Sequence, residues 1–298
     1  RLGQRPGEGP SSSRTRRVMN RPLRSYLAVA QLDLAEVLRS RWLLFCVIVY
    51  AVLAVVFLMV GMRESTVFGF TGTGRVLVSY VHALLVLLPL MALIATGQVI
   101  NKARDDGTLE ILFSQPISRG AYFSAISSVR FLVLLAPLAV LMAAVGIFGR
   151  LAFDQQISWS FIGHCIVLCS VLVWSFSGIG LWVSTTVQNS ARATMYLLLI
   201  WVAGIALMDF ALAGMMLQWR LEPRVVFALA ALNPVQSIRM ALLSSADPEL
   251  SVLGPVGFYL ANQIGSTGLY VLGVGWPMLL GTLAWLSGLW KLRRGDVV

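Results

Sequence analysis

The sequence predicts an all-α polytopic membrane protein with six transmembrane helices, and three observations lead to this prediction. Of 298 residues, 58% are hydrophobic and only 12% are charged, whereas a soluble domain carries about 25% charged residues. Several apolar runs reach about 20 residues, the length that a helix needs to cross a bilayer. The net charge of +10 is concentrated before the first of these runs. The uninterrupted runs exclude a soluble protein with an unusually apolar core.

The N-terminal segment, residues 1–24, is expected to be a disordered basic tail. It is rich in Arg, Gly, Pro and Ser and has few side chains that could pack. Met19 is an alternative first residue of the chain. A cleavable signal peptide is not expected, because the first apolar run lacks a small-residue cleavage site and is long enough to be a span. Residues 25–298 are expected to form one six-span domain.

Residues 25–40 are predicted to form an amphipathic helix that lies in the membrane interface directly before the first span. An ordinary lead-in to that span is the alternative. The apolar positions that share one predicted face are Leu27, Ala30, Leu34, Val37 and Leu38. The polar positions that lie mainly opposite are Gln31, Asp33, Glu36 and Arg39.

Six spans follow this helix. Pro89, Pro137 and Pro277 fall inside them, which is acceptable because neighbouring helices can satisfy the backbone groups that a proline frees. The predicted spans are residues 42–62, 76–97, 128–148, 161–184, 194–217 and 269–290.

The distribution of Lys and Arg predicts the orientation of the chain. With the N-terminus inside, the inner segments hold sixteen of these residues and the outer segments six, with Arg130 at a span end. Because positive charge stays on the cytoplasmic side, both termini are expected on the cytoplasmic side of the membrane. The membrane is expected to be a bacterial inner membrane. Beyond residues 1–41 there is no basic patch interleaved with aromatic residues, so a nucleic-acid partner is not expected.

The outer loop at residues 218–268 is long and partly apolar. Residues 225–232 and 235–243 are predicted to be two short helices, broken at Asn233 and Pro234 because the residue before a proline is pushed out of helical geometry. Neither helix is long enough to cross a bilayer, which favours an external cap that lies on the membrane or on a partner. A re-entrant seventh span is the alternative.

Few residues could carry chemistry of their own. The sequence contains no Walker, zincin, phosphate-loop or nucleophile-elbow motif, and its only histidines are His82 and His164. Cys165 and Cys169 are one helical turn apart and could share a soft metal ion, but small cysteines also serve as packing residues in membranes. No disulfide framework is implied, because all three cysteines fall in apolar runs. Neither a metal site nor another cofactor is expected.

Asp209 is the carboxylate that lies well inside a predicted span. Burying its charge costs several kcal/mol unless the charge is paired or solvated. It is therefore expected either to line a substrate path, to hold the fifth span against a neighbour, or to make a structural hydrogen bond to another helix.

A polar insert at residues 98–121 separates the second and third spans. Asp105 and Asp106 stand just before or at the start of a predicted short helix, where the helix dipole favours acidic residues. Leu109, Leu112 and Phe113 fall at helical spacing and form a small apolar face. Pro116 is expected to stop this helix, and Ser118 is expected to cap the next. A simple charged loop is the alternative.

The string Asp106-Gly-Thr-Leu-Glu-Ile-Leu-Phe-Ser-Gln-Pro-Ile-Ser-Arg119 resembles the signature of type-2 ABC exporter permeases. The resemblance implies that this insert is a cytoplasmic coupling helix, and that it and the interfacial helix contact a separate ABC ATPase subunit. It also implies two permease and two ATPase copies, and ATP hydrolysis on the partner chain rather than here. The hypothesis that follows is that the apolar face fills a groove on the ATPase. The ATPase-coupling positions are Asp105, Asp106, Gly107, Thr108, Leu109, Glu110, Leu112, Phe113, Pro116 and Arg119.

A narrower resemblance is to the permeases that help to mature nitrous-oxide reductase. It rests on Arg41-Trp-Leu-Leu, on Asp209-Phe and on Leu232-Asn-Pro with Arg239 five residues after the proline. It implies that Asn233, Pro234 and Arg239 contact a periplasmic partner that supports assembly of a copper–sulfur centre. Two alternatives stay open: a permease that exports a drug, lipid or peptide, and a membrane enzyme or metal-handling protein.

Overall fold

The computed structural model describes residues 21–63, 72–153, 158–211, 214, 223–246 and 265–294. All regular secondary structure in these ranges is helical, which confirms the all-α prediction. Residues 1–20 of the predicted tail and residues 218–222 and 247–264 of the predicted outer loop lie outside the described residues. Residues 21–24, which were expected to belong to the tail, form the first turn of a helix instead.

Within the described ranges, six single helices are long and apolar enough to cross a membrane, so the six predicted spans are confirmed. They are Arg41–Met59, Leu77–Asp105, Arg119–Phe148, Trp159–Thr186, Ser190–Ala211 and Gly265–Arg294. In chain order the described elements are α2 (Arg21–Arg39), α3 (Arg41–Arg63), α4 (Gly72–Gly97), α5 (Val99–Asp105), α6 (Thr108–Ser114), α7 (Arg119–Phe153), α8 (Trp159–Thr186), α9 (Ser190–Val202), the π-helical turn η1 (Ala203–Leu207), α11 (Pro223–Leu232), α12 (Pro234–Ala246) and α14 (Gly265–Arg294).

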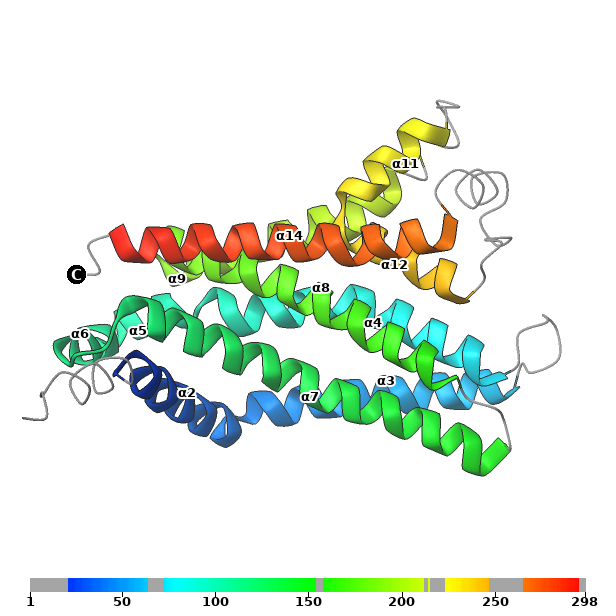
Figure 1. Ribbon diagram of the computed structural model, residues 1–298, viewed down its shortest axis with the longest axis horizontal. Coiled ribbons are helices and arrows are strands. Elements are labelled where there is room, and N and C mark those ends of the chain that lie inside the picture. The colour runs from blue at the N-terminus through cyan, green and yellow to red at the C-terminus, as the bar shows by residue number, and fades with distance from the viewer. Residues whose placement is uncertain are drawn as a thin grey trace, which may run out of the picture.

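The long helices form an elongated bundle, with α6 and the C-terminal end of α14 at one end (Figure 1). We call this the α6 end. Helix α8 lies at the centre and packs against α4, α7, α12 and α14. Fully buried apolar side chains from α4, α7 and α8, among them Leu84, Leu138 and Leu172, fill the middle of the bundle. Helix α8 is therefore the central helix around which these elements pack.

Two glycines allow α8 and α14 to approach closely. A Cβ atom added to Gly178 would lie 2.3 Å from the carbonyl oxygen of Gly281, and one added to Gly281 would lie 2.6 Å from the Cα of Ser175. These are contacts with backbone, which cannot move aside as a flexible side chain would. Small residues at such crossings give helices in a membrane their close packing.

Replacing Gly281 with Ala is therefore expected to destabilise the chain by about 1–3 kcal/mol, the usual cost of overpacking. The thermal unfolding temperature of the protein in detergent measures this effect. Gly275→Ala is the matched control, because Gly275 is on the same helix and an added Cβ there would meet nothing within 4 Å. Equal unfolding temperatures for the two variants would contradict the prediction.

Helix α2 covers the residues of the predicted interfacial helix, and it packs inside the chain partly through Asp33, which was placed on the polar face. It lies along α7 (Figure 1) and buries Val29, Asp33 and Val37, which are spaced four residues apart. Leu27 and Leu34, from the predicted apolar face, are exposed. The bundle takes the smaller side chains, and the leucines stay uncovered by the chain, as is typical of a helix whose apolar stripe faces the membrane interface.

The helix pair α11 and α12 does not form the expected external cap. The two helices meet at an angle of 113°, and α12 packs against α4, α8 and α14 with most of its side chains buried. The indole Nε1 of Trp276 donates to the carbonyl oxygen of Leu232, 2.8 Å away. Trp276 is about 16 Å along α14 from the helix start, at 1.5 Å per residue. The junction of the pair therefore reaches well into the bundle, as in the re-entrant alternative.

Candidate functional site

The polar insert forms α5 and α6, two short helices joined by a tight turn at the α6 end (Figure 1). Gly107 takes a left-handed conformation with φ of 67°, which costs glycine little because it has no Cβ. Helix α6 starts at Thr108 and ends at Ser114, before Pro116. Ser118 then accepts a hydrogen bond from the backbone N–H of Ala121 at 3.2 Å. The predicted stop and cap are confirmed, and Asp106 stands just before α6, but Asp105 is the last residue of α5.

The apolar stripe of α6 packs inside its own chain. Leu109 is only 1% exposed, while Leu112 and Phe113 are half-buried against the same cluster. The ring of Phe113 meets that of Tyr122 edge-on at 5.7 Å. The hypothesis that this stripe fills a groove on a partner is therefore wrong for Leu109, whose side chain has no surface to offer.

The opposite face of α6 is exposed and combines negative charge with one large apolar residue. Asp105, Asp106 and Glu110 are exposed, and Ile111 is 67% exposed. Ser114 extends the same uncovered surface. An isolated exposed isoleucine needs no explanation on a soluble surface, but here it stands in the centre of α6, next to Glu110 and close to the acidic residues of the preceding turn. This exposed face of α6 is the part of the insert that a partner could contact.

Leu109 is the centre of a cluster that joins five helices besides α6. The cluster, which we call the α6 cluster, contains buried residues of α2, α5, α7, α8 and α14: Val29, Ile100, Leu109, Tyr122, Phe123, Ala125, Ile126, Leu181, Leu289 and Leu292. Close-packed interiors have low compressibility and transmit strain. A displacement of α6 would therefore be felt directly by these five helices.

Arg119 fastens the insert to the last span. Its Nη1 donates to the carbonyl oxygens of Leu292 and Arg293, at 3.1 and 3.2 Å. Its guanidinium also lies 5.8 Å from the centre of the Phe113 ring. A cation is favourable at the C-terminal carbonyls of a helix. Arg119 thus links α6, the start of α7 and the end of α14.

A buried ion pair links α2 to α7. Arg130 Nη2 donates to Asp33 Oδ1 at 2.7 Å, and both side chains are largely buried. Burial raises the pKa of Asp33 above its ordinary value of 3.8, and the charge of Arg130 only partly opposes this rise. Because the folded chain holds the proton more tightly than the unfolded chain, the stability from protonated Asp33 is lost as pH rises from the ordinary pKa through the raised one.

A second polar network joins the fifth span to α12. Asp209 follows the turn η1, and its carboxylate accepts from both ends of the Arg239 guanidinium, with Nη1 to Oδ1 at 2.9 Å and Nη2 to Oδ2 at 3.3 Å. Gln236 Nε2 also donates to Asp209 Oδ1. Bidentate pairing of this kind fixes the relative orientation of the two side chains as well as neutralising their charges. Asp209 is therefore a paired charge rather than a lone one.

The junction of α11 and α12 is bound to the same span. Asn233 is buried, its Nδ2 donates to the carbonyl oxygen of Gly204, and its Oδ1 accepts from the N–H of Val235 at 2.8 Å. Gly204 belongs to η1, and the wider turn of a π-helix frees carbonyl groups from their usual i+4 partners. The irregular turn and the hairpin junction thus satisfy each other's polar groups.

Residues 27–289 match the family described as "ABC-2 family transporter protein". The chain belongs to this family. It is 25% identical over 232 residues to a "Probable ABC transporter permease protein NosY" of Stutzerimonas stutzeri, which covers 76% of this chain and 84% of the relative. A protein of the same name from Pseudomonas aeruginosa is 27% identical over 242 residues, or 74% of this chain and 82% of the relative. The chain is a multi-pass permease subunit of an ABC transporter.

The metal-handling alternative gains no support from the geometry of this ABC-2 permease. Cys165 and Cys169 are fully buried and free. His164 is hydrogen-bonded to the carbonyl oxygen of Ser160 at 2.7 Å, and its ring packs edge-on against Tyr270 at 4.9 Å. Within the described ranges, no three His, Cys, Asp or Glu residues lie close enough together to hold a metal ion. These side chains act as packing residues.

Residues that the sequence singled out for different reasons lie together where the fifth span meets α12. Asp209 pairs with Arg239, which was expected to contact an outside partner. This pairing agrees with the expectation that Asp209 holds the fifth span against a neighbouring helix. Asn233 is buried rather than available to a partner, and Pro234 begins α12. The participation of Gln236 was missed. The spacing of Asn233, Gln236 and Arg239 at intervals of three residues was the available signal, because it places them on neighbouring turns of one helix face.

Proposed function

We propose that this permease couples ATP hydrolysis on a separate ATPase subunit to conformational work across the membrane, and that α6 is the element that docks on the ATPase. The observation that carries the proposal is the division of α6 into two faces. Its inner residue Leu109 is 1% exposed within the α6 cluster, whereas Ile111 is 67% exposed on the other side. A helix with these two faces can be displaced by a partner bound to its exposed face and can transmit the displacement to the bundle through its buried face.

The proposed roles of the insert residues follow from their positions. Asp106, Thr108, Glu110 and Ile111 offer surface to the ATPase, together with the exposed Asp105 and Pro116. Gly107 sets the turn that presents them. Leu109, Leu112 and Phe113 transmit the movement to the α6 cluster, and Arg119 carries it to the end of α14. The acidic surface predicts a complementary basic rim around an apolar hollow on the partner.

The proposed working unit contains two permease copies and two ATPase subunits in a bacterial inner membrane, with the α6 end in the cytoplasm. The basic residues at this end support the orientation, because cytoplasmic segments retain Lys and Arg. Lys102 and Arg104 lie in α5, and Lys291, Arg293 and Arg294 end α14. The opposite ends of the described spans carry fewer basic side chains.

The proposed role of this movement is to support maturation of the copper–sulfur centre of nitrous-oxide reductase. Two relatives named NosY and the three sequence features of the narrower resemblance support it. The hairpin of α11 and α12 would then transmit the movement to a periplasmic partner. Asn233, Pro234 and Arg239 would act by fixing the shape of this hairpin, since their contacts lie within the chain.

Deleting the gene in its own host is expected to leave nitrous-oxide reductase without its copper–sulfur centre and without N2O-reducing activity. Copper content and the absorption spectrum of the purified reductase measure this outcome. The gene returned on a plasmid should restore both. A fully active, copper-replete reductase from the deletion strain would contradict the maturation role and favour export of a drug, lipid or peptide, while leaving ATPase coupling to be judged by its own test.

A further inference from the structure

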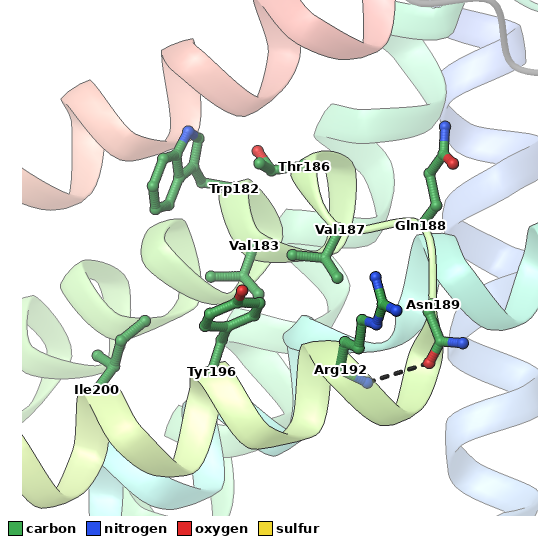
Figure 2. Close-up of a pocket in the computed structure, with 9 residues that line it drawn as sticks. All are labelled: Trp182, Val183, Thr186, Val187, Gln188, Asn189, Arg192, Tyr196 and Ile200. Carbon is green, nitrogen blue, oxygen red and sulfur yellow. Dashed lines mark hydrogen bonds between the residues drawn. The ribbon is translucent and has the colours of Figure 1, made fainter.

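We propose that a groove between α9 and α14, at the α6 end, binds an anionic phospholipid. The C-terminal turns of α8 form the floor of the groove. Figure 2 shows Trp182 and Thr186 on α8, with Arg192, Tyr196 and Ile200 arranged along α9. The proposal goes beyond energy coupling and does not depend on an ATPase being bound.

The groove consists of two adjoining hollows. The first has a volume of about 670 Å³ and lies between α8 and α9. The second has a volume of about 460 Å³ and lies between α8 and α14, lined by Leu286, Trp290 and Lys291 among others. Trp182 and Thr186 line both hollows. One hollow therefore opens on each side of the Trp182 indole, which suits a ligand with two chains.

The polarity of the walls changes along the helix axis. Asn189 and Arg192 stand at the start of α9, and Ile200 lies about 12 Å deeper, at 1.5 Å per residue. In the second hollow Lys291 is nearest the helix end and Leu286 is deeper. A polar mouth over an apolar interior, with Trp and Tyr between them, is the profile of a membrane interface. A phospholipid has the same profile.

The charge at the mouth favours an anionic headgroup. Arg192 and Lys291 are exposed, and neither forms an ion pair within the described part of the chain. Asn189 caps α9 by accepting from the N–H of Arg192 at 3.1 Å (Figure 2), which fixes the position of this turn. The Thr186 hydroxyl is buried in the wall without a hydrogen-bond partner among the described residues. Basic pockets between spans on the cytoplasmic side are typical anionic-lipid sites.

A second copy of the chain fits the groove less well. A two-fold contact here would bring the Arg192 and Lys291 side chains of both copies together. No acidic residue of the described ranges lines either hollow, so these charges would lie at an interface without a partner. The core of a protein interface is depleted of lysine. An anionic lipid supplies the missing negative charge.

Native mass spectrometry of the full chain in a neutral detergent tests the proposal, with phosphatidylglycerol, phosphatidylcholine and soluble glycerol 1-phosphate as probes. The wild type is expected to retain phosphatidylglycerol in preference to the other two. Arg192→Gln and Lys291→Gln should each lower its retention about fivefold, the weight of one basic residue at an anionic membrane surface. Thr186→Val is expected to lower the retention of phosphatidylglycerol as well. This variant changes no charge, so it tests the proposal even if a charge variant fails to fold.

Arg150→Gln is the matched control. Arg150 is an exposed basic residue in the last turn of α7, far from the α6 end where the groove lies, so its loss should leave phosphatidylglycerol retention unchanged. Three results would overturn the proposal. The first is equal loss of phosphatidylglycerol from the control and the groove variants. The second is equally tight binding of glycerol 1-phosphate. The third is a disulfide between two copies of Ser287→Cys in native membranes, which would show that a second chain covers the groove.

Discussion

Replacing Ile111 with Asp is expected to remove the ATPase from the purified permease while leaving the permease folded. Ile111 is 67% exposed within the chain, so the substitution costs the isolated permease little. At a docking surface, the change loses the burial of an isoleucine side chain and adds a charge that must be desolvated. Together these cost about 3 kcal/mol or more, which is roughly a hundredfold in affinity. Co-purification of the ATPase with a tagged permease measures the loss.

Two variants on the same helix serve as controls for this result. Ser114→Asp adds the same charge at an exposed position without removing an apolar side chain, and we expect it to retain more ATPase than Ile111→Asp. Leu109→Asp places a carboxylate in the α6 cluster and should lower the unfolding temperature of the permease itself. A stoichiometric complex with Ile111→Asp would show that α6 does not dock through this face.

Removing the guanidinium of Arg239 is expected to be the most destabilising single change in the fifth span and its surroundings. Arg239→Met leaves the Asp209 carboxylate inside a span with Gln236 as its remaining partner. An unpaired charge at membrane depth costs about 3 kcal/mol. The thermal unfolding temperature of the purified chain in detergent should fall accordingly. Limited proteolysis should also cut the region of α12 more readily.

The double variant Asp209→Leu with Arg239→Met distinguishes a pairing effect from the loss of a side chain. The double variant leaves no carboxylate without its cation at membrane depth, so it should be more stable than Arg239→Met alone. If both proteins are equally unstable, the pair is not the cause. A stable double variant that fails to support reductase maturation would assign Asp209 and Arg239 to function rather than to packing.

The spans, the interfacial helix and the coupling insert could be predicted because each depends on a local property. Hydropathy along a single segment decides whether that segment can enter lipid. The turn at Gly107, the stop before Pro116 and the cap at Ser118 depend on the conformational limits of individual residues. These predictions agree with the described helices α2 to α9 and α14. Charge counting also predicted an orientation, which remains a prediction.

The packing partners could not be predicted in the same way. Helix α2 carries apolar side chains around much of its surface, and only the structure shows that Val29 and Val37 are buried against the chain while Leu27 and Leu34 stay exposed. Hydrophobicity does not distinguish these two sets of side chains, because a neighbouring helix and a lipid chain are equally apolar. The same ambiguity made the helix pair α11 and α12 look like a surface cap.

The sequence by itself therefore determined that this chain is a six-span permease with a short helix between its second and third spans, since hydropathy and turn chemistry depend on individual residues and short segments. The tertiary structure alone decided which face of that helix is free, with Leu109 inside and Ile111 outside. It also decided that Asp209 and Arg239, 30 residues apart, form one pair. Both outcomes depend on how helices meet in space, because a buried charge or a small apolar face is stable only against a neighbour that fits it.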